Sequence, residues 1–140
     1  MFSYIKTNYG PMEIYTLNGM VYLCHFVDEI PIGSEYLDIS TKDLHSYFRD
    51  KYELVGTPFQ KEVWRAIGGI PRGQTRTYGE IAEAIGSSKS ARAVAKACGS
   101  NRLAILVPCH RVVAKNGMGG YKWGADLKAK LLRMEEMDLQ

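Results

Sequence analysis

The hydrophobic pattern of this chain changes near residue 56. Before that point, two strand-like runs, 12–17 and 20–27, are separated by Asn18-Gly19, a dipeptide that favours the type I′ turn of a β-hairpin. From residue 59 onward, apolar residues recur at the spacing of a helix. The pattern therefore predicts an α+β protein, with a short N-terminal α/β cap at 1–56 and a mainly helical domain at 57–140.

The N-terminal part contains two further candidate elements. Residues 2–6 have the character of a third strand. Residues 38–51 are predicted to form a short helix, with Leu44, Tyr47 and Phe48 on one face. We expect this part to support the fold rather than to react.

Cysteine and histidine usage argues against a disulfide framework and a metal site. The three cysteines form no Cys-x-x-Cys pair, and Cys24, His25 and His45 fit no standard zinc spacing. No apolar run approaches the roughly 18 residues that cross a bilayer, and the N-terminus lacks the apolar core of a signal peptide. We therefore expect a protein of the cytoplasm, or of the nucleus in a eukaryote, with no metal and no membrane partner. The length of 140 residues does not demand an oligomer, so we expect a monomer.

The helical domain contains a helix-turn-helix pattern. A core helix at 59–70 ends at Pro71, and Thr77 to Glu80 has the Thr-x-x-Glu form of a capping box that begins the next helix. Gly86-Ser87-Ser88 is predicted to end that helix and to supply the N-cap of a further helix at 90–98. Residues 77–98 are therefore predicted to form two helices joined by a tight turn.

The two parts of the chain differ in charge. Residues 1–56 contain 4 basic and 8 acidic side chains, whereas residues 57–140 contain 14 basic and 7 acidic ones. The alanine-rich helix at 90–98 carries Arg92 and Lys96 one turn apart, so it could approach a polyanion such as DNA closely. An ordinary solvated surface and a well-packed core helix are the alternative interpretations.

A cysteine and a histidine are adjacent in the segment Pro108-Cys109-His110-Arg111-Val112. They follow the apolar run 103–107, which predicts a buried strand that Pro108 interrupts. A thiol beside an imidazole is a candidate nucleophile, because a nearby positive charge increases the thiolate fraction. A buried structural cysteine is the alternative interpretation.

Together these segments resemble the O6-alkylguanine-DNA alkyltransferases, also called methylated-DNA–protein-cysteine methyltransferases. The resemblance implies a suicide repair reaction without a cofactor, in which a thiolate removes the alkyl group from O6-alkylguanine in double-stranded DNA and keeps it as a thioether. It extends over about 56–135, and the matching segments are Gly56-Thr57-Pro58-Phe59-Gln60, Val63-Trp64, Ile70-Pro71-Arg72-Gly73, Thr77-Tyr78-Gly79, Ala91-Arg92-Ala93-Val94, Asn101 and Pro108-Cys109-His110-Arg111-Val112.

The resemblance also implies catalytic roles. Cys109 is the alkyl acceptor, and His110 removes its proton through a water. Glu135 orients the imidazole, and Asn101 braces the turns around the site. Without the resemblance, Glu135 would be interpreted as a solvated surface carboxylate, because acidic residues flank it.

Contacts with the substrate and with DNA follow from the same resemblance. Tyr78 donates a hydrogen bond to N3 of the guanine, and Arg92 enters the duplex in place of the flipped nucleotide, with its helix in the minor groove. The alkyl pocket is formed by Val107, Tyr121 and Trp123. The other DNA contacts, mostly with the backbone, are Gln60, Gly79, Ser87 and Lys115.

Trp123 is bulky for the glycine-rich loop 116–124 in which it lies. We therefore expect it to disfavour benzylated guanine relative to methylated guanine. Three other classes of protein stay open at this point. They are a base-flipping sensor, whose related group lacks the cysteine, a thiol hydrolase, which would turn over, and a winged-helix transcription factor, which has no need of the Cys-His pair.

Overall fold

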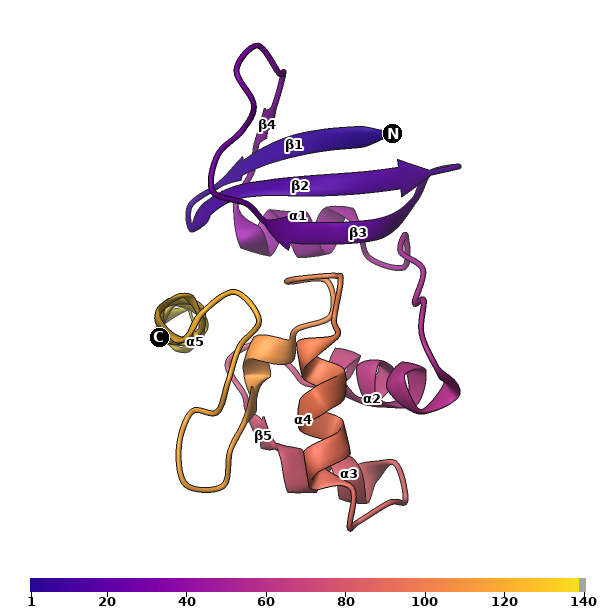
Figure 1. Ribbon diagram of the computed structural model, residues 1–140. Helices are drawn as coiled ribbons and strands as arrows, with labels where there is room; N and C mark the ends of the chain where they lie inside the picture. The colour runs from indigo at the N-terminus through magenta and orange to yellow at the C-terminus, as the bar shows by residue number, and fades with distance from the viewer. Residues whose placement is uncertain (139–140) are drawn as a thin grey trace. The chain divides into compact units, whose positions relative to one another are not determined.

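The computed structural model describes residues 1–138 of the chain, which divide into two compact units (Figure 1). The first unit consists of Met1–Val55 and Arg102–Leu106, and the second of Gly56–Asn101 and the described residues from Val107 onward. The predicted boundary at 56/57 did not include the return of 102–106 to the first unit. That return is held by the main chain of β3 (Met20–Phe26), because Cys24 N donates to Arg102 O at 2.8 Å and Ala104 N donates to Cys24 O at 2.7 Å.

The first unit contains a four-stranded sheet in the order β3-β2-β1-β4. The hairpin pairs β2 (Gly10–Leu17) with β3 in antiparallel register, and Asn18 and Gly19 between them have φ of 53° and 80°. Both φ angles are positive, as a type I′ turn requires, so the predicted hairpin is confirmed. The predicted third strand is β1 (Phe2–Thr7), antiparallel to β2, and the short β4 (Leu37–Asp38) adds in parallel.

The helix α1 of this unit (Thr41–Tyr47) is shorter than the predicted 38–51. It begins after Ser40, whose hydroxyl accepts a hydrogen bond from Asp43 N at 3.1 Å, and it lies against one face of the sheet (Figure 1). Leu44 is fully buried, but Tyr47 is 58% exposed, so the predicted apolar face is wrong at Tyr47. The buried side chains of this two-turn helix are those of Thr41 and Leu44, which lie one turn apart.

The apolar run 103–107 is buried but is not the predicted strand. Only Leu103 makes a bridge, to Cys24, and the next three residues form a turn in which Leu106 N donates to Ala104 O at 2.8 Å. Ile105 has a φ of 71°, which a strand does not allow. A continuous apolar run therefore indicated burial here, but not the backbone conformation.

The second unit is mainly helical, with a short parallel pairing of β5 (Arg76–Thr77) and β6 (Val112–Val113). The predicted helix-turn-helix is present, and it consists of α3 (Tyr78–Ala84) and α4 (Ala91–Gly99). Trp64 is buried, and its Nε1 donates to Ala97 O at 2.9 Å. The helical elements are α2 (Pro58–Gly68), α3 (Tyr78–Ala84), α4 (Ala91–Gly99), η1 (Cys109–Arg111) and α5 (Ala125–Met137).

The turn between α3 and α4 differs in detail from the prediction. Gly86, with φ of 76°, follows the end of α3, but Ser87 and Ser88 do not cap α4. Ser87 instead accepts a main-chain hydrogen bond from Ser90 N at 2.9 Å, which places Ser90 at the N-cap. The hydroxyl of Ser90 pairs with that of Ser87 and makes no capping bond to the helix.

The capping box at the start of α3 is confirmed. Thr77 Oγ1 accepts from Glu80 N at 3.1 Å, and Glu80 Oε1 accepts from Thr77 N at 2.9 Å. We expect Thr77→Ala to lower the free energy of unfolding by about 1 kcal/mol, because the main-chain N–H of Glu80 loses its hydrogen-bond acceptor. Urea unfolding measures the effect, and Thr77→Ser, which keeps the hydroxyl, is the control. An equal loss in both variants would contradict the capping interpretation.

No helix among residues 1–138 has the length and apolar character needed to cross a membrane.

Candidate active site

Cys109 lines a small cavity in the second unit. It is the first residue of η1 and is 4% exposed. The cavity has a volume of about 320 Å³ and draws its walls from α3, α4, η1 and the loop before α5. The residues that line it are Tyr78, Ala95, Cys98, Gly99, Cys109, Gly120, Tyr121 and Lys122. A cavity of this size can admit one small group of a larger molecule and bring it to the thiol.

Glu135 is a buried carboxylate paired with three basic side chains, of which Arg72 is the most distant, with Nη1 3.6 Å from Oε2. Arg111 binds it bidentately, with Nε to Oε1 at 2.9 Å and Nη2 to Oε2 at 2.8 Å, and His110 Nε2 lies 3.0 Å from Oε2. Burial opposes ionisation, but the hydrogen bonds from Arg111 and His110 outweigh it and hold the pKa of Glu135 at about 2. Glu135 is therefore ionised at neutral pH, and the surface interpretation of this residue is wrong.

His110 is poised as a neutral base. Burial lowers the pKa of His110 below its ordinary value of 6.5, although Glu135 acts in the opposite direction. The carboxylate at Nε2 fixes the tautomer with the proton on that nitrogen. The other nitrogen, Nδ1, is buried and has no hydrogen-bond partner within residues 1–138, so its lone pair is available to accept a proton.

Lys128 is a buried cation that the sequence analysis missed. Its Nζ donates to Val112 O at 2.6 Å and to Gly120 O at 2.9 Å, which ties η1 and β6 to the cavity loop. Its positive charge acts to lower the pKa of Cys109. A lysine in a charged helix looks solvent-exposed, but its spacing to the buried Leu131 and Glu135 places all three on one face of α5.

Asn101 connects two parts of the site. Its Nδ2 donates to Val107 O at 3.0 Å, and its side chain also hydrogen-bonds with Cys109, which acts to lower the pKa of that thiol. Lys122 Nζ donates to the Asn101 main-chain oxygen at 3.2 Å. The bracing position expected for Asn101 is therefore present.

Tyr78 and Tyr121 face the cavity, whereas Val107 and Trp123 do not line it. Tyr78 approaches the loop so closely that a Cβ on Gly119, where φ is 73°, would lie 2.6 Å from its hydroxyl oxygen. Trp123 packs edge-on against Tyr121 at a ring separation of 5.3 Å. Trp123 thus supports a wall residue instead of forming the wall itself.

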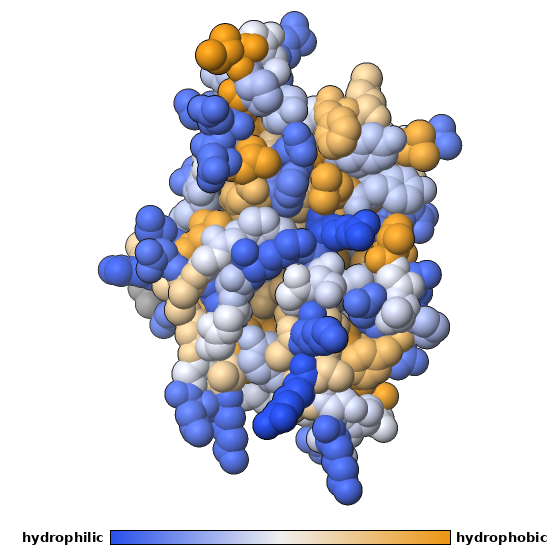
Figure 2. Space-filling model, viewed as in Figure 1, coloured by the Kyte–Doolittle hydropathy of each residue, from blue (hydrophilic) through white to orange (hydrophobic). Residues whose placement is uncertain are grey.

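The residues expected to contact DNA lie at or near the surface of the second unit. Arg92 and Lys115 are exposed, and so is Gly79 at the start of α3. Gln60 and Ser87 are half-buried, and Gln60 Oε1 is already used in accepting from Thr57 N at 2.9 Å. Figure 2 shows hydrophilic side chains projecting from the part of the molecule formed by α3 and α4.

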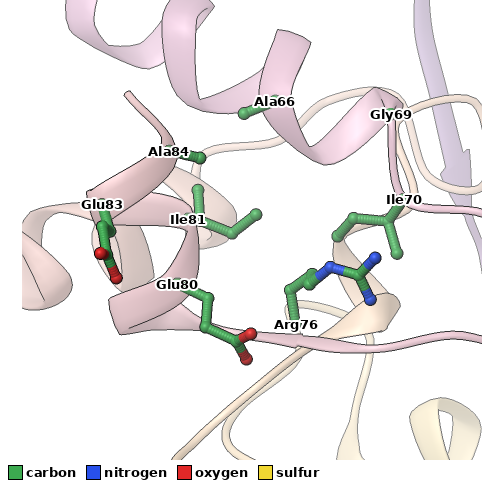
Figure 3. Close-up of a pocket in the computed structure, with 8 residues that line it drawn as sticks. All are labelled: Ala66, Gly69, Ile70, Arg76, Glu80, Ile81, Glu83 and Ala84. Atoms are coloured by element: carbon green, nitrogen blue, oxygen red, sulfur yellow. The ribbon is translucent and has the colours of Figure 1, made fainter. Parts of the chain in front are cut away.

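A second cavity, of about 410 Å³, lies between α2, β5 and α3 (Figure 3). Ala66, Ile70 and Ile81 form its apolar side, and Arg76 and Glu80 lie at its edge. It contains no cysteine or histidine, so it offers no nucleophile comparable with Cys109.

The candidate zinc ligands of the first unit do not form a site. Cys24 is buried in the sheet, and His25 Nε2 pairs with Glu13 Oε1 at 3.0 Å. Within the described part of the chain, no three His, Cys, Asp or Glu side chains group to hold a metal ion.

Comparison with known proteins identifies the relatives of this chain. The family model for the DNA-binding domain of 6-O-methylguanine DNA methyltransferase matches residues 58–137. A probable methylated-DNA–protein-cysteine methyltransferase of Acanthamoeba polyphaga mimivirus is 51% identical over 109 residues, which are 72% of this chain and 73% of the relative.

Solved structures agree with these sequence matches. The Mycobacterium tuberculosis OGT in complex with DNA has a TM-score of 0.80 and 33% identity, with 97% of this chain and 92% of that chain covered. The S. pombe Atl1 in complex with damaged DNA containing O6-carboxymethylguanine has a TM-score of 0.52 and 30% identity, with 59% of this chain and 79% of that chain covered. The chain therefore belongs to the 6-O-methylguanine DNA methyltransferase family.

Proposed function

We propose that this protein repairs DNA by transferring the alkyl group of O6-alkylguanine to Cys109, once per molecule. The observation that carries the proposal is the arrangement at the cavity, where the buried Cys109 is next to His110 in the chain and His110 is hydrogen-bonded to the ionised Glu135. Family membership supports the same reaction. We propose that a monomer acts, because Cys109, His110 and Glu135 all belong to the second compact unit of the chain.

The reaction proceeds by nucleophilic displacement. His110 Nδ1 takes the proton of Cys109 through a bridging water, and the thiolate attacks the alkyl carbon. A C–S bond forms as the C–O6 bond breaks, and the electron pair of that bond stays on the guanine, which then takes up a proton. Tyr78 donates a hydrogen bond to N3 and so stabilises the negative charge that develops on the leaving base.

The substrate base must leave the duplex to reach Cys109, because the thiol lies inside a cavity. We propose that α4 enters the minor groove, where its small alanines permit close approach, and that Arg92 replaces the flipped guanine in the stack. Gln60, Gly79, Ser87 and Lys115 would contact the DNA around it, mostly its backbone.

The reaction is tested by measuring the repair of duplex DNA that contains one O6-methylguanine. The proposal predicts that the lesion is converted to guanine until one equivalent per protein molecule has been repaired, and that conversion then stops. Continued turnover would indicate a hydrolase. Tight binding without conversion would indicate a sensor of alkylated bases. A Cys24→Ala variant is the control for loss of a thiol outside the site.

Arg92→Ala is expected to lower alkyl transfer from duplex DNA by about 10- to 100-fold. The reason is that unstacking a base costs a few kcal/mol, of which the inserted side chain offsets a part. Transfer from the free base O6-benzylguanine should change less than twofold, because no base is flipped. Arg133→Ala, which removes an exposed arginine from α5, is the control. Equal losses with both substrates would contradict the role of Arg92 in flipping.

Trp123→Gly is expected to raise the ratio of benzyl to methyl transfer. Without the indole, Tyr121 loses its edge-on support and the cavity wall can retreat to admit a larger group. Single-turnover rates with O6-benzylguanine and O6-methylguanine in otherwise identical duplexes give the ratio. An unchanged ratio would show that Trp123 does not restrict alkyl size.

A further inference from the structure

The cavity that contains the proposed alkyl acceptor also contains a second cysteine. Cys98 lies in the last turn of α4, and Cys98 and Cys109 both line the cavity. Their thiols are hydrogen-bonded to each other. The proposed transfer reaction uses only one of these sulfurs, so Cys98 has no part in the mechanism above.

The two sulfurs share an environment that favours one thiolate. Their hydrogen bond lowers the pKa of Cys98, and the same hydrogen bond, together with burial, raises the pKa of Cys109. The positive charge of Lys128 lowers both. The pair therefore titrates jointly, and the first proton to leave produces a thiolate in contact with a thiol.

Cys24, the third cysteine, lies outside the cavity and serves as a comparison for the pKa and accessibility of the pair. Cys24 is fully buried in the sheet of the first unit, and burial raises its pKa to about 12. It stays a thiol at neutral pH and offers no surface to a reagent. Cys98 is only partly buried and opens into the cavity, so small oxidants can reach the pair.

We propose that Cys98 is the resolving partner of Cys109, and that a peroxide joins the two as a reversible intramolecular disulfide. His110 first takes the proton of Cys109, as in the transfer reaction, and the resulting thiolate attacks the O–O bond of hydrogen peroxide. An S–O bond forms, the O–O bond breaks, and the departing oxygen leaves as water after protonation. Cys98 then attacks the sulfenic sulfur, the S–S bond forms and a second water leaves. Two thiols and one peroxide thus give one disulfide and two waters, and a dithiol reductant restores both thiols.

The geometry suits this chemistry. Both cysteines line the same cavity, and each is among the causes of the shifted pKa of the other, so the two sulfurs are close enough to interact directly. Cys98 lies on α4 and Cys109 on η1, so two different elements bring the two side chains to one cavity.

The disulfide has a consequence that rests on the proposed function. A sulfenic acid without a partner oxidises further to sulfinic acid, which dithiols do not reduce. Because each molecule transfers one alkyl group, such oxidation would remove it from the repair pool permanently. When Cys98 forms the disulfide instead, a dithiol can reduce it and regenerate the free Cys109 thiol that accepts the alkyl group.

The experiment treats the full chain with hydrogen peroxide, blocks remaining thiols with iodoacetamide and maps the bridge. Trypsin cleavage after Lys96, Arg102 and Arg111 places the two cysteines on separate peptides, 97–102 and 103–111. The proposal predicts a cross-link between these peptides in the wild type and in Cys24→Ala. In Cys98→Ala it predicts sulfinic acid on Cys109 that dithiothreitol does not reverse.

Alkyl transfer is measured on the same samples. Transfer should be lost in oxidised wild type and restored by dithiothreitol, whereas oxidised Cys98→Ala should stay below one tenth of its own activity before oxidation. The absence of the cross-link, or full recovery of Cys98→Ala, would overturn the proposal. The peptide map needs no DNA, so a cross-link in a protein without transferase activity would reject the proposed function and leave the disulfide standing.

Discussion

His110→Gln is expected to lower the rate of alkyl transfer at neutral pH by about 100- to 1,000-fold, the range typical of a lost general base. The structure gives the reason. Cys109 has a pKa raised well above its ordinary value by its hydrogen bond with Cys98 and by burial, so few molecules hold a thiolate without help. His110 is the adjacent base with a buried, unshared Nδ1 in the part of the chain described.

The pH dependence separates loss of a base from general damage to the site. In the wild type the rate should be nearly constant above pH 6.5 and fall below it, as His110 becomes protonated at its lowered pKa. In His110→Gln the rate should instead rise about tenfold per pH unit through the alkaline range, following the thiolate fraction. His25→Gln removes a histidine of the first unit and is the control. A pH-independent loss in His110→Gln would contradict the role of general base.

Glu135→Gln is expected to lower the free energy of unfolding by about 3–5 kcal/mol, the usual effect of breaking a buried ion pair. The amide cannot neutralise Arg111, which is itself buried and would be left with an uncompensated charge. The neighbouring Glu136 is exposed, so Glu136→Gln should change stability by less than about 0.5 kcal/mol. Urea unfolding of both variants gives the comparison, and similar values for the two would contradict the buried network.

The pKa values also fix the pH range in which this network contributes. The pKa of Glu135 is lowered on folding from 4.5 to about 2, so its contribution is complete above 4.5 and is lost as the pH falls through about 2. The pKa of His110 is also lowered, so stability falls first as the pH drops below 6.5, where the unfolded chain takes up a proton on that histidine. His110→Gln should lack the first loss, and Glu135→Gln the second.

Local signals in the sequence predicted local structure well. Asn18-Gly19 needs only its own backbone to make a type I′ turn, and Thr77 with Glu80 needs only one turn of helix to make a capping box. These interactions are complete within a few residues, so distant contacts do not overrule them.

The errors occurred where distant contacts decide the outcome. Ile105 lies in a run that is apolar enough for a strand, yet the chain turns there and the backbone adopts a positive φ. The apolar composition of the run is enough to predict that it is buried. The direction of its backbone depends on which hydrogen-bond partners the rest of the fold supplies. The sequence contains no local sign of that turn.

In the candidate site, too, local features could be predicted from the sequence, whereas features that depend on distant contacts could not. The adjacent Cys109 and His110 were visible as a pair, and the resemblance supplied Glu135 and Asn101. Lys128 was missed because a lysine among charged residues is ordinarily solvated, and its burial follows from the carbonyls of Val112 and Gly120, which lie elsewhere in the chain. Cys98 carried no signal of its own in the sequence, because only the fold places it in the same cavity as Cys109.

The central claim is that Cys109 keeps the alkyl group, and intact-protein mass spectrometry tests it most directly. Wild type and Cys109→Ala are incubated with excess duplex DNA that carries one O6-methylguanine, and the modified residue is mapped on peptide 103–111. The account predicts one added methyl group per wild-type molecule, on Cys109, and none on Cys109→Ala. An unchanged mass of the wild type, or a methyl group on another residue, would contradict it.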